Sequence, residues 1–167
     1  HDRSSHVAYD PESNEESIHF RSLKLAALQK TLKTPPVFGD PEGELLVIGW
    51  GSTQGAIEEA VASLREAGRK VSSMHLRFLQ PLPGGLKEIM QRFGKVMTIE
   101  GNWSDRPEDA IIDQGNRRYS ALAMLLRSRT LIDVDCWGEV KGQPIKPGAL
   151  RRVLLDKLKP ALKEASR

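Results

Sequence analysis

The chain has 167 residues, of which 39% are hydrophobic, which is enough for one buried core but not for a multidomain enzyme. Its 25 Lys and Arg residues against 22 Asp and Glu residues give a net charge of +3, too small to indicate a nucleic-acid-binding protein. The single cysteine, Cys136, excludes an internal disulfide framework, a thiolate zinc site and a self-contained iron–sulfur cluster.

Residues 1–36 are predicted to form an arm and a connector helix that precede an α/β domain over residues 37–167. The first 17 residues are acidic and contain almost no large apolar side chains, so we expect an extended arm. The segment 18–32 has apolar residues near helical spacing and predicts a helix. Pro35 and Pro36 end this helix because proline lacks the amide hydrogen that a continuing helix needs.

The remainder of the chain alternates strand and helix patterns. Residues 45–48 form a short apolar run bounded by glycines, which is typical of a strand covered on both faces. Further strands are predicted at 71–76, 96–100 and 131–134, and helices at 56–68, 86–93, 118–128 and from Gly148 onward. This alternation predicts a parallel sheet with helices on both faces. A polar stretch over residues 101–115 is too long for an ordinary connection.

Candidate functional residues follow the predicted strands, because ligands of open α/β sheets bind outside the carboxyl ends of the strands. The first strand is followed by Gly49, Gly51, Ser52 and Thr53, with glycines for a tight turn and hydroxyl groups able to cap the next helix. Free amides at such a helix start attract anions. The segment lacks a Walker lysine and the dinucleotide-binding spacing, so a plain cap and tight turn is favoured over an anion site.

His75 and Arg77 end the second strand, and Glu100 and Asn102 end the third. The first two residues lie two positions apart, hence on one face of a continuing strand, where both could reach a carboxylate or a phosphate. We favour the structural alternative, a hydrogen-bonded core histidine beside an arginine that forms an ion pair. Glu100 is then the expected partner of Arg77 across adjacent strand ends, which favours an architectural role over proton transfer.

Other reactive side chains carry weaker signals. His1 and His6 have no third ligand nearby, so no metal site is expected. Cys136 is interpreted as a small buried apolar group. Residues 141–167 contain eight Lys or Arg against two acidic residues, which indicates a solvated helix face or a docking surface for an acidic partner. Without interleaved aromatic residues, this segment does not indicate binding to nucleic acid.

No segment predicts a membrane helix or a secretion signal. The longest apolar run, residues 121–126, is far shorter than the roughly 20 residues that a membrane helix needs. We therefore expect a soluble cytoplasmic protein that makes no membrane contact. The chain begins at His1 instead of Met, which suggests a domain taken from a longer protein.

Several of these motifs resemble one known family. The run GELLVIGWGSTQGAIEEAVASLREAGRKVSSMHLRFLQPLP, followed by VMTIEGNWS, LLRSRTLIDV and KGQPIKPGAL, resembles the carboxyl-terminal domain (core domain II) of the alpha subunit of 2-oxoacid:ferredoxin oxidoreductases. The similarity covers about residues 1–150 and leans toward the 2-oxoglutarate enzymes. It implies a Rossmann-like domain similar to the carboxyl-terminal domain of transketolase, a three-layer αβα sandwich on a mostly parallel sheet of about five strands.

The resemblance also implies a division of labour. In this family the complex decarboxylates a 2-oxoacid on thiamine diphosphate with magnesium, passes electrons through an iron–sulfur cluster to ferredoxin, and releases an acyl-CoA. Those cofactors are implied to lie outside this domain, which would contact the beta subunit and the remaining alpha-subunit domains without performing catalysis. The single cysteine and the lack of a Gly-Asp-Gly diphosphate signature agree with this role. The isolated domain is expected to be inactive and prone to self-association.

One departure from the family limits what the resemblance implies. Relatives pass quickly from the Glu-x-Asn element into a Gly-Gln-Leu helix start, whereas this chain inserts SDRPEDAIIDQGNRRYSA, so the loop 101–117 is expected to make contacts of its own. An alternative function is an anion, CoA or effector site that uses the loop 49–53 and Arg77. The positions that match the family, and to which we assign an interface or structural role, are Gly49, Gly51, Ser52, Thr53, His75, Arg77, Glu100 and Asn102.

Overall fold

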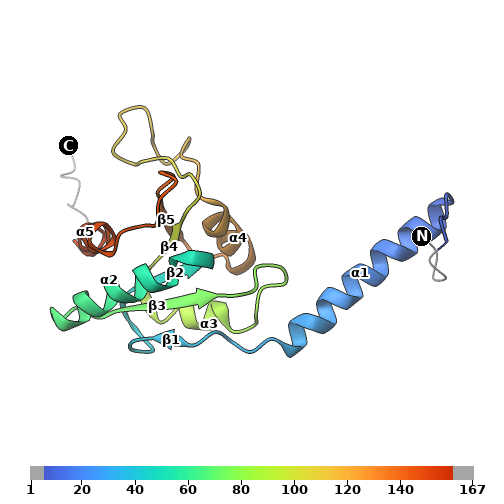
Figure 1. Cartoon of the computed structure of the whole chain (residues 1–167), viewed down its shortest axis with the longest axis horizontal. Helices are drawn as coiled ribbons and strands as arrows, with labels where there is room; N and C mark the ends of the chain where they lie inside the picture. Colours follow the sequence, from blue (N-terminus) through green and yellow to red (C-terminus); the bar gives the residue numbers. More distant parts are fainter. Residues whose placement is uncertain (1–5, 160–167) are drawn as a thin grey trace. The chain divides into compact units, whose positions relative to one another are not determined.

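The computed structural model describes residues 6–159 (Figure 1). The chain divides into two compact units, one of residues 1–34 with 78–85 and one of residues 35–77 with 86–167. Within residues 6–159, no helix combines the length and the hydropathy that crossing a bilayer requires.

The first unit is built around the helix α1 (Pro11–Thr31), which starts earlier than the sequence predicted. The expected extended arm is wrong from residue 11 onward, and residues 1–5 lie outside the described part of the chain. Asp10 caps the helix by accepting a hydrogen bond from the Ser13 amide at 2.7 Å, and Pro11 fits the first turn, where no amide donor is needed. The prediction failed because it required apolar residues that a helix could bury, whereas α1 contains no buried residue.

A hydrogen bond joins the two segments of this first unit. Gln29 Nε2, in the last turns of α1, donates to the carbonyl oxygen of Leu82 at 2.7 Å. The segment 78–85 is therefore held to the helix, although about 50 residues of chain separate the two partners.

The second unit is built on a five-stranded sheet with the order β1-β3-β2-β4-β5. The prediction of an α/β fold on a mostly parallel sheet is confirmed. The short strand β1 was not predicted, because two residues are too few to show a strand pattern. β1 (Val37–Phe38) pairs antiparallel with β3, while β2 (Gly43–Trp50), β3 (Val71–Leu76), β4 (Phe93–Glu100) and β5 (Val134–Gly138) are parallel.

Helices cover both faces of this sheet, which makes three layers (Figure 1). On one face, α2 (Gln54–Glu66) and α5 (Pro147–Leu158) share a buried cluster with residues of β2, β3 and β4. Strand side chains alternate between faces, and on the other face α3 (Leu86–Met90) and α4 (Ala121–Thr130) lie against β4 and β5. The main members of the first cluster are Leu45, Val47, Ile57, Val61, Leu64, Met97, Ile99, Leu150 and Leu154.

Two predicted boundaries are wrong for identifiable reasons. The short helix α3 ends at Met90, and β4 already begins at Phe93, where it pairs with Gly43 of β2. The last strand runs over 134–138 instead of 131–134. Leu131 ends α4 in the left-handed conformation (φ 58°) and is 84% exposed, so its apolar side chain does not belong to a strand.

Candidate functional site

The glycines at the end of β2 serve packing and turn geometry. Gly49 faces α2, and a Cβ atom there would lie 2.3 Å from Ile57 Cδ1 and 2.6 Å from Thr53 Oγ1. Gly51 has φ 62°, a conformation that side-chain-bearing residues rarely adopt. Both positions therefore need glycine for the strand to turn tightly into the helix.

The hydroxyl groups of the same loop do not cap α2, so that part of the prediction is wrong. Thr53 Oγ1 donates to the carbonyl oxygen of Trp50 at 2.9 Å, and the helix has no side-chain cap. Ser52 is exposed within a single 3-10 turn, Gly51–Thr53. This loop is a tight turn that contains no hydroxyl cap.

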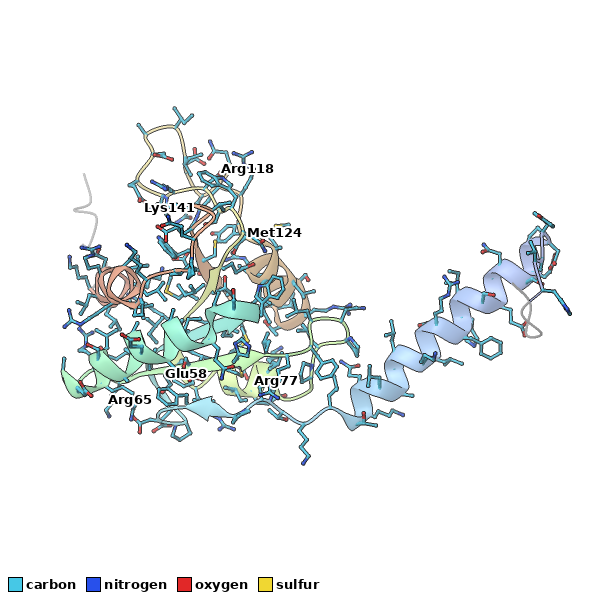
Figure 2. The ribbon with its side chains drawn as sticks, viewed as in Figure 1. Glu58, Arg65, Arg77, Arg118, Met124 and Lys141 are labelled. Carbon is cyan, nitrogen blue, oxygen red and sulfur yellow. The ribbon has the colours of Figure 1, made fainter. Side chains whose placement is uncertain are left out.

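His75 is half-buried near the end of β3, where it lines a very small cavity with Gln54 and Glu58 of α2. Burial lowers the pKa of the imidazole below its ordinary value, while Glu58 raises it and Arg77 lowers it by smaller amounts. Its Nδ1 atom is buried and has no hydrogen-bond partner within residues 6–159. Arg77 is exposed (Figure 2), and no hydrogen bond or ion pair to it is found in that same part of the chain.

The expected ion pair between Arg77 and Glu100 is not formed. Arg77 follows β3 and Glu100 ends β4, and these strands are not neighbours because β2 runs between them. The prediction assumed that strands consecutive in sequence are adjacent in the sheet.

Glu100 instead binds the start of α4 and is fully buried. Its carboxylate accepts hydrogen bonds from two backbone amides in the first turn of that helix. Charged oxygens are stabilised there by unpaired amides and by the helix dipole. Ser120, the residue at the helix start, makes no side-chain cap of its own. The donors are Thr98 Oγ1 (2.9 Å), Ser120 Oγ, Asn102 Nδ2 (3.2 Å), and the amides of Leu122 (3.0 Å) and Ala123 (3.3 Å).

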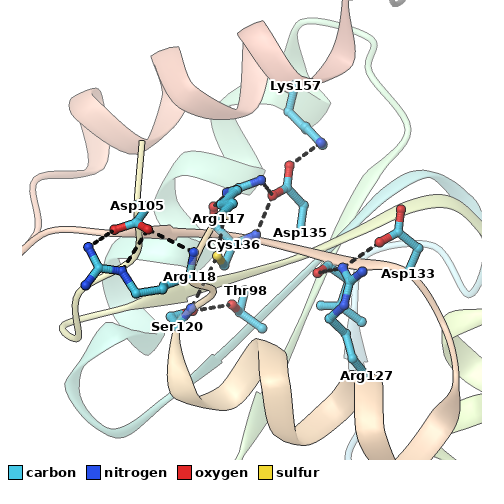
Figure 3. A network of polar contacts seen from close by, with 11 residues as sticks. Thr98, Asp105, Arg117, Arg118, Ser120, Arg127, Asp133, Asp135, Cys136 and Lys157 are labelled. Carbon is cyan, nitrogen blue, oxygen red and sulfur yellow. Dashed lines mark hydrogen bonds and ion pairs between the residues drawn. The ribbon is translucent and has the colours of Figure 1, made fainter. Parts of the chain in front are cut away.

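The long loop between β4 and α4 is closed at its base by Asp105 and Arg118 (Figure 3). The Asp105 amide donates to the Arg118 carbonyl at 2.9 Å, and the Arg118 amide donates to Asp105 Oδ2 at 2.9 Å. Two guanidinium nitrogens of Arg118 also donate to the two Asp105 oxygens, each at 2.9 Å. Trp103 Nε1 adds a hydrogen bond of 3.1 Å. The result is a surface loop whose ends are held together, as in an Ω-loop.

The same loop covers the outer edge of β5, which no further strand pairs with in the described sheet. Arg117 Nη2, from the loop, donates to the Cys136 carbonyl at 3.1 Å. Arg127 Nη1, from α4, donates to the Val134 carbonyl at 2.8 Å. Figure 3 shows both arginine side chains. Both guanidinium groups lie over the Tyr119 ring, at 4.6 and 4.3 Å from its centroid. Arginine side chains thus satisfy strand carbonyls that would otherwise be left unpaired.

Asp135 connects the loop to α5. It pairs with Arg117 at 2.8 Å and with Lys157 (Figure 3). Burial raises the pKa of Asp135, but Lys157, then the Cys136 amide and then Arg117 outweigh it, so the pKa lies below its ordinary value. Cys136 is buried as predicted, and its Sγ accepts a hydrogen bond from the Ser120 amide at 3.4 Å. Sequence reasoning missed the ion pairs of this loop, and its only signal was the unusual length of the polar segment.

A cavity of about 720 Å³ lies among the loop 105–118, β5 and α5. It lies beside the strand edge that the loop covers. Within residues 6–159, no cluster of three or more His, Cys, Asp or Glu side chains is placed to hold a metal ion. The side chains around the cavity include Met97, Glu108, Ile112, Asp113, Arg117, Tyr119, Asp133, Asp135, Trp137, Val153, Asp156 and Lys157.

Replacing Asp105 with asparagine is expected to open the loop and leave the sheet intact. The Arg118 guanidinium and amide hold the pKa of Asp105 well below its ordinary value. In moderately acidic solution Asp105 therefore stays ionised in the folded protein, whereas the same side chain takes up a proton in the unfolded chain. Its contribution to stability is therefore present above about pH 4 and is lost as the pH falls from there through the folded-state pKa. The readouts are cleavage at Glu108 by a glutamate-specific protease and thermal unfolding across pH.

We expect Asp105→Asn to be cleaved faster at neutral pH, and its stability difference from the parent to shrink below about pH 4. Asp109→Asn, a change of the same kind inside the loop, is the control and is expected to have little effect. A stability difference that stays constant through the acid range would contradict this account of the Asp105 ion pair.

The middle of the chain matches a known protein family. The model for the pyruvate:ferredoxin oxidoreductase core domain II matches residues 43–119. The chain is 34% identical over 140 residues to the 2-oxoglutarate oxidoreductase subunit KorA of Mycobacterium tuberculosis. That alignment covers 83% of this chain but only 19% of KorA, so the chain spans about a fifth of this relative's length.

Solved structures share the fold. A 2-oxoglutarate:ferredoxin oxidoreductase from Magnetococcus marinus, solved with 2-oxoglutarate, coenzyme A and succinyl-CoA bound, matches with a TM-score of 0.73 at 24% identity. The match covers 95% of this chain and 26% of that one. A split-gene transketolase, an inactive beta4 tetramer, matches 75% of this chain and 41% of its own with a TM-score of 0.51 at 17% identity. The fold resemblance predicted from the sequence motifs is confirmed.

Proposed function

Because the chain belongs, through residues 43–119, to the core domain II family of pyruvate:ferredoxin oxidoreductases, we propose that it is a subunit-contact domain without catalytic residues of its own. The parent would be the alpha subunit of a 2-oxoacid:ferredoxin oxidoreductase that oxidises 2-oxoglutarate. Residues 37–167 would form the contact domain, and residues 1–36 its connection to the neighbouring alpha-subunit domain. The similarity to KorA supports the choice of 2-oxoacid.

One observation carries the proposal. Glu100, the carboxylate at the sheet edge where α/β domains bind ligands, is fully buried and accepts hydrogen bonds from five internal groups. A carboxylate used in this way stabilises the fold and has no free lone pair for proton transfer to a substrate. We assign an architectural role also to Gly49, Gly51 and Thr53, which shape the turn into α2.

The helix α1 supports the contact part of the proposal. It has no buried residue, and its apolar side chains include Ile18, Leu23, Leu25 and Leu28, which are 37–54% exposed. Apolar side chains gathered on one exposed element are typical of surfaces that another polypeptide covers.

The cofactors of the proposed parent complex do not fit the donor groups of this chain. An iron–sulfur cluster needs several thiolates, and the only cysteine, Cys136, is buried and hydrogen-bonded to the Ser120 amide. The described residues also lack a carboxylate cluster suited to a magnesium diphosphate. We therefore propose that thiamine diphosphate, magnesium, the iron–sulfur cluster and the site that reduces ferredoxin are held elsewhere in the complex.

Co-expression with the beta subunit and the remaining alpha-subunit domains tests the proposed function. We expect the chain to co-elute with them in size-exclusion chromatography. Alone, it is expected to give no calorimetric heat with thiamine diphosphate and Mg²⁺, and no reduction of viologen dye with 2-oxoglutarate and CoA. Turnover by the chain alone, or its elution apart from every partner, would overturn the proposal.

A second candidate function is an anion or CoA site formed by the loop 49–53 and Arg77. It is favoured by the exposed Arg77 guanidinium and the unpartnered His75 Nδ1. The free Nδ1 atom is itself buried, however, and the cavity beside it holds only about 10 Å³. A calorimetric titration of the chain with CoA distinguishes the two functions, because this alternative requires heat with CoA that disappears in Arg77→Ala.

A further inference from the structure

The cavity beside β5 has the size of a ligand site. Its volume of about 720 Å³ falls within the range of roughly 300–1,000 Å³ typical of binding pockets. One wall is the loop 105–118, which the Asp105–Arg118 ion pair and backbone bonds hold closed at its base. The opposite walls are β5 and α5. The cavity is therefore formed before any ligand arrives.

The residues that line the cavity carry more acidic than basic side chains. Five of its lining residues are acidic, and two, Arg117 and Lys157, are basic. Both basic side chains are already paired with Asp135. Two acidic residues at the rim have partners of their own outside the lining, since Asp133 pairs with Arg127 at 2.5 Å and Asp156 with Lys159 at 2.7 Å.

The two remaining acidic residues, Glu108 and Asp113, have no basic partner within residues 6–159. Asp113 accepts hydrogen bonds only from backbone amides of its own loop, at 2.7 Å from Gly115 and 3.0 Å from Asn116. Both residues belong to the inserted loop, and both line the cavity. Both side chains are exposed to solvent, so they would repel an anionic ligand and are free to pair with a cationic group.

The uncharged part of the lining suits the stem of a long basic side chain. Trp137 contributes a half-buried aromatic ring, and Ile112 and Val153 contribute aliphatic surface. The Tyr119 ring is not available in the same way, because Arg117 and Arg127 already lie over it. Aromatic faces attract ammonium and guanidinium groups. Lysine and arginine side chains bury an apolar stem while their charged end reaches a polar partner. The lining thus matches both parts of such a side chain.

We propose that this cavity receives a lysine or arginine side chain from a basic segment of a partner polypeptide. The stem would lie against Trp137 and Ile112, and the charged end would pair with Glu108 and Asp113. The inference rests on the proposed function, because it takes the partner to be another polypeptide of the same assembly. It assigns a binding role to the loop 105–118 that the fold of the sheet does not require.

The test is an NMR titration of the 167-residue chain with Nα-acetyl-arginine methylamide and Nα-acetyl-lysine methylamide. We expect saturable shifts of the Trp137 indole signal and of amides in the loop and β5, with dissociation constants in the millimolar range. The citrulline analogue, which has the shape of arginine without its charge, is expected to cause no saturable shift. The double variant Glu108→Gln, Asp113→Asn is expected to weaken binding by about fivefold or more.

Asp109→Asn is the matched control variant, because Asp109 lies in the same loop but does not line the cavity. Equal binding of the citrulline analogue, no saturable shift with either basic probe, or equal weakening by Asp109→Asn would each overturn the inference. Co-elution with the partner subunits is measured separately. Saturable shifts without co-elution would reject the proposed function but support a cavity that binds basic side chains. Co-elution without saturable shifts would support the proposed function and reject the binding of basic side chains in this cavity.

Discussion

Replacing Glu100 with leucine is expected to lower the free energy of unfolding by about 3–5 kcal/mol. The substitution removes the shared acceptor of five donors, two of them amides in the first turn of α4. The Thr98 and Ser120 hydroxyls can still bond to each other at 3.3 Å, but the two buried amides cannot, and each buried unsatisfied group costs about 1–3 kcal/mol. The helix start should open, so the amides of Leu122 and Ala123 should exchange with solvent faster. Urea denaturation and hydrogen exchange measure the two effects.

Glu100→Gln refines this test, because it keeps one carbonyl oxygen and the size of the side chain. We expect a smaller loss of about 2 kcal/mol, since the charge that interacts with the helix dipole is gone and one acceptor becomes a donor. Glu66→Gln on the exposed end of α2 is the control and should change stability little. A Glu100→Leu variant as stable as the parent would show that the carboxylate is not needed to hold α4.

Replacing Gly138 with alanine is expected to cost about 3 kcal/mol, because the added methyl group has no room. A Cβ atom there would lie 2.0 Å from the carbonyl oxygen of Asn102, and backbone cannot move aside as a flexible side chain can. The end of β5 would have to separate from the turn after β4, breaking the hydrogen bond from the Glu139 amide to the Glu100 carbonyl. Urea denaturation measures the loss.

Gly148→Ala is the matched control for Gly138→Ala. Gly148 lies in the first turn of α5, where an added Cβ meets nothing within 4 Å. Alanine is the better helix former by about 1 kcal/mol in a helix interior, so this variant should be as stable as the parent or slightly more stable. If the two glycine variants behave alike, the close approach of β5 to the turn at Asn102 is not a constraint on the fold.

Local periodicity was sufficient to predict the framework of the domain. The apolar run 45–48 and the stripe of Ile57, Val61 and Leu64 correctly located β2 and α2, because a strand or helix that buries one surface must repeat apolar residues at its own period. The same reasoning failed for α1, which buries nothing and begins where Asp10 caps it. It also failed at Leu131, whose apolar side chain lies exposed at the end of a helix.

The sequence correctly placed the candidate residues at the carboxyl ends of strands. It did not predict which residues they contact. Arg77 and Glu100 both follow predicted strands, yet β2 separates them, and strand order is decided by how the crossovers pack. Glu100 finds its partners about 20 residues further along the chain, at the start of α4. No local sequence pattern predicts that a carboxylate on a strand will cap a helix that begins about 20 residues later.

The sequence alone determined the fold class, the alternation of strands and helices, and the family, because these depend on residue patterns within short segments. Only the tertiary structure decided what the polar residues do. The use of Glu100 as a helix cap, the closure of the long loop by Asp105 and Arg118, and the acidic cavity beneath that loop all depend on contacts between distant segments. Such contacts form only when the packed sheet brings those segments together, and burial then makes an unpaired polar group too costly to leave free.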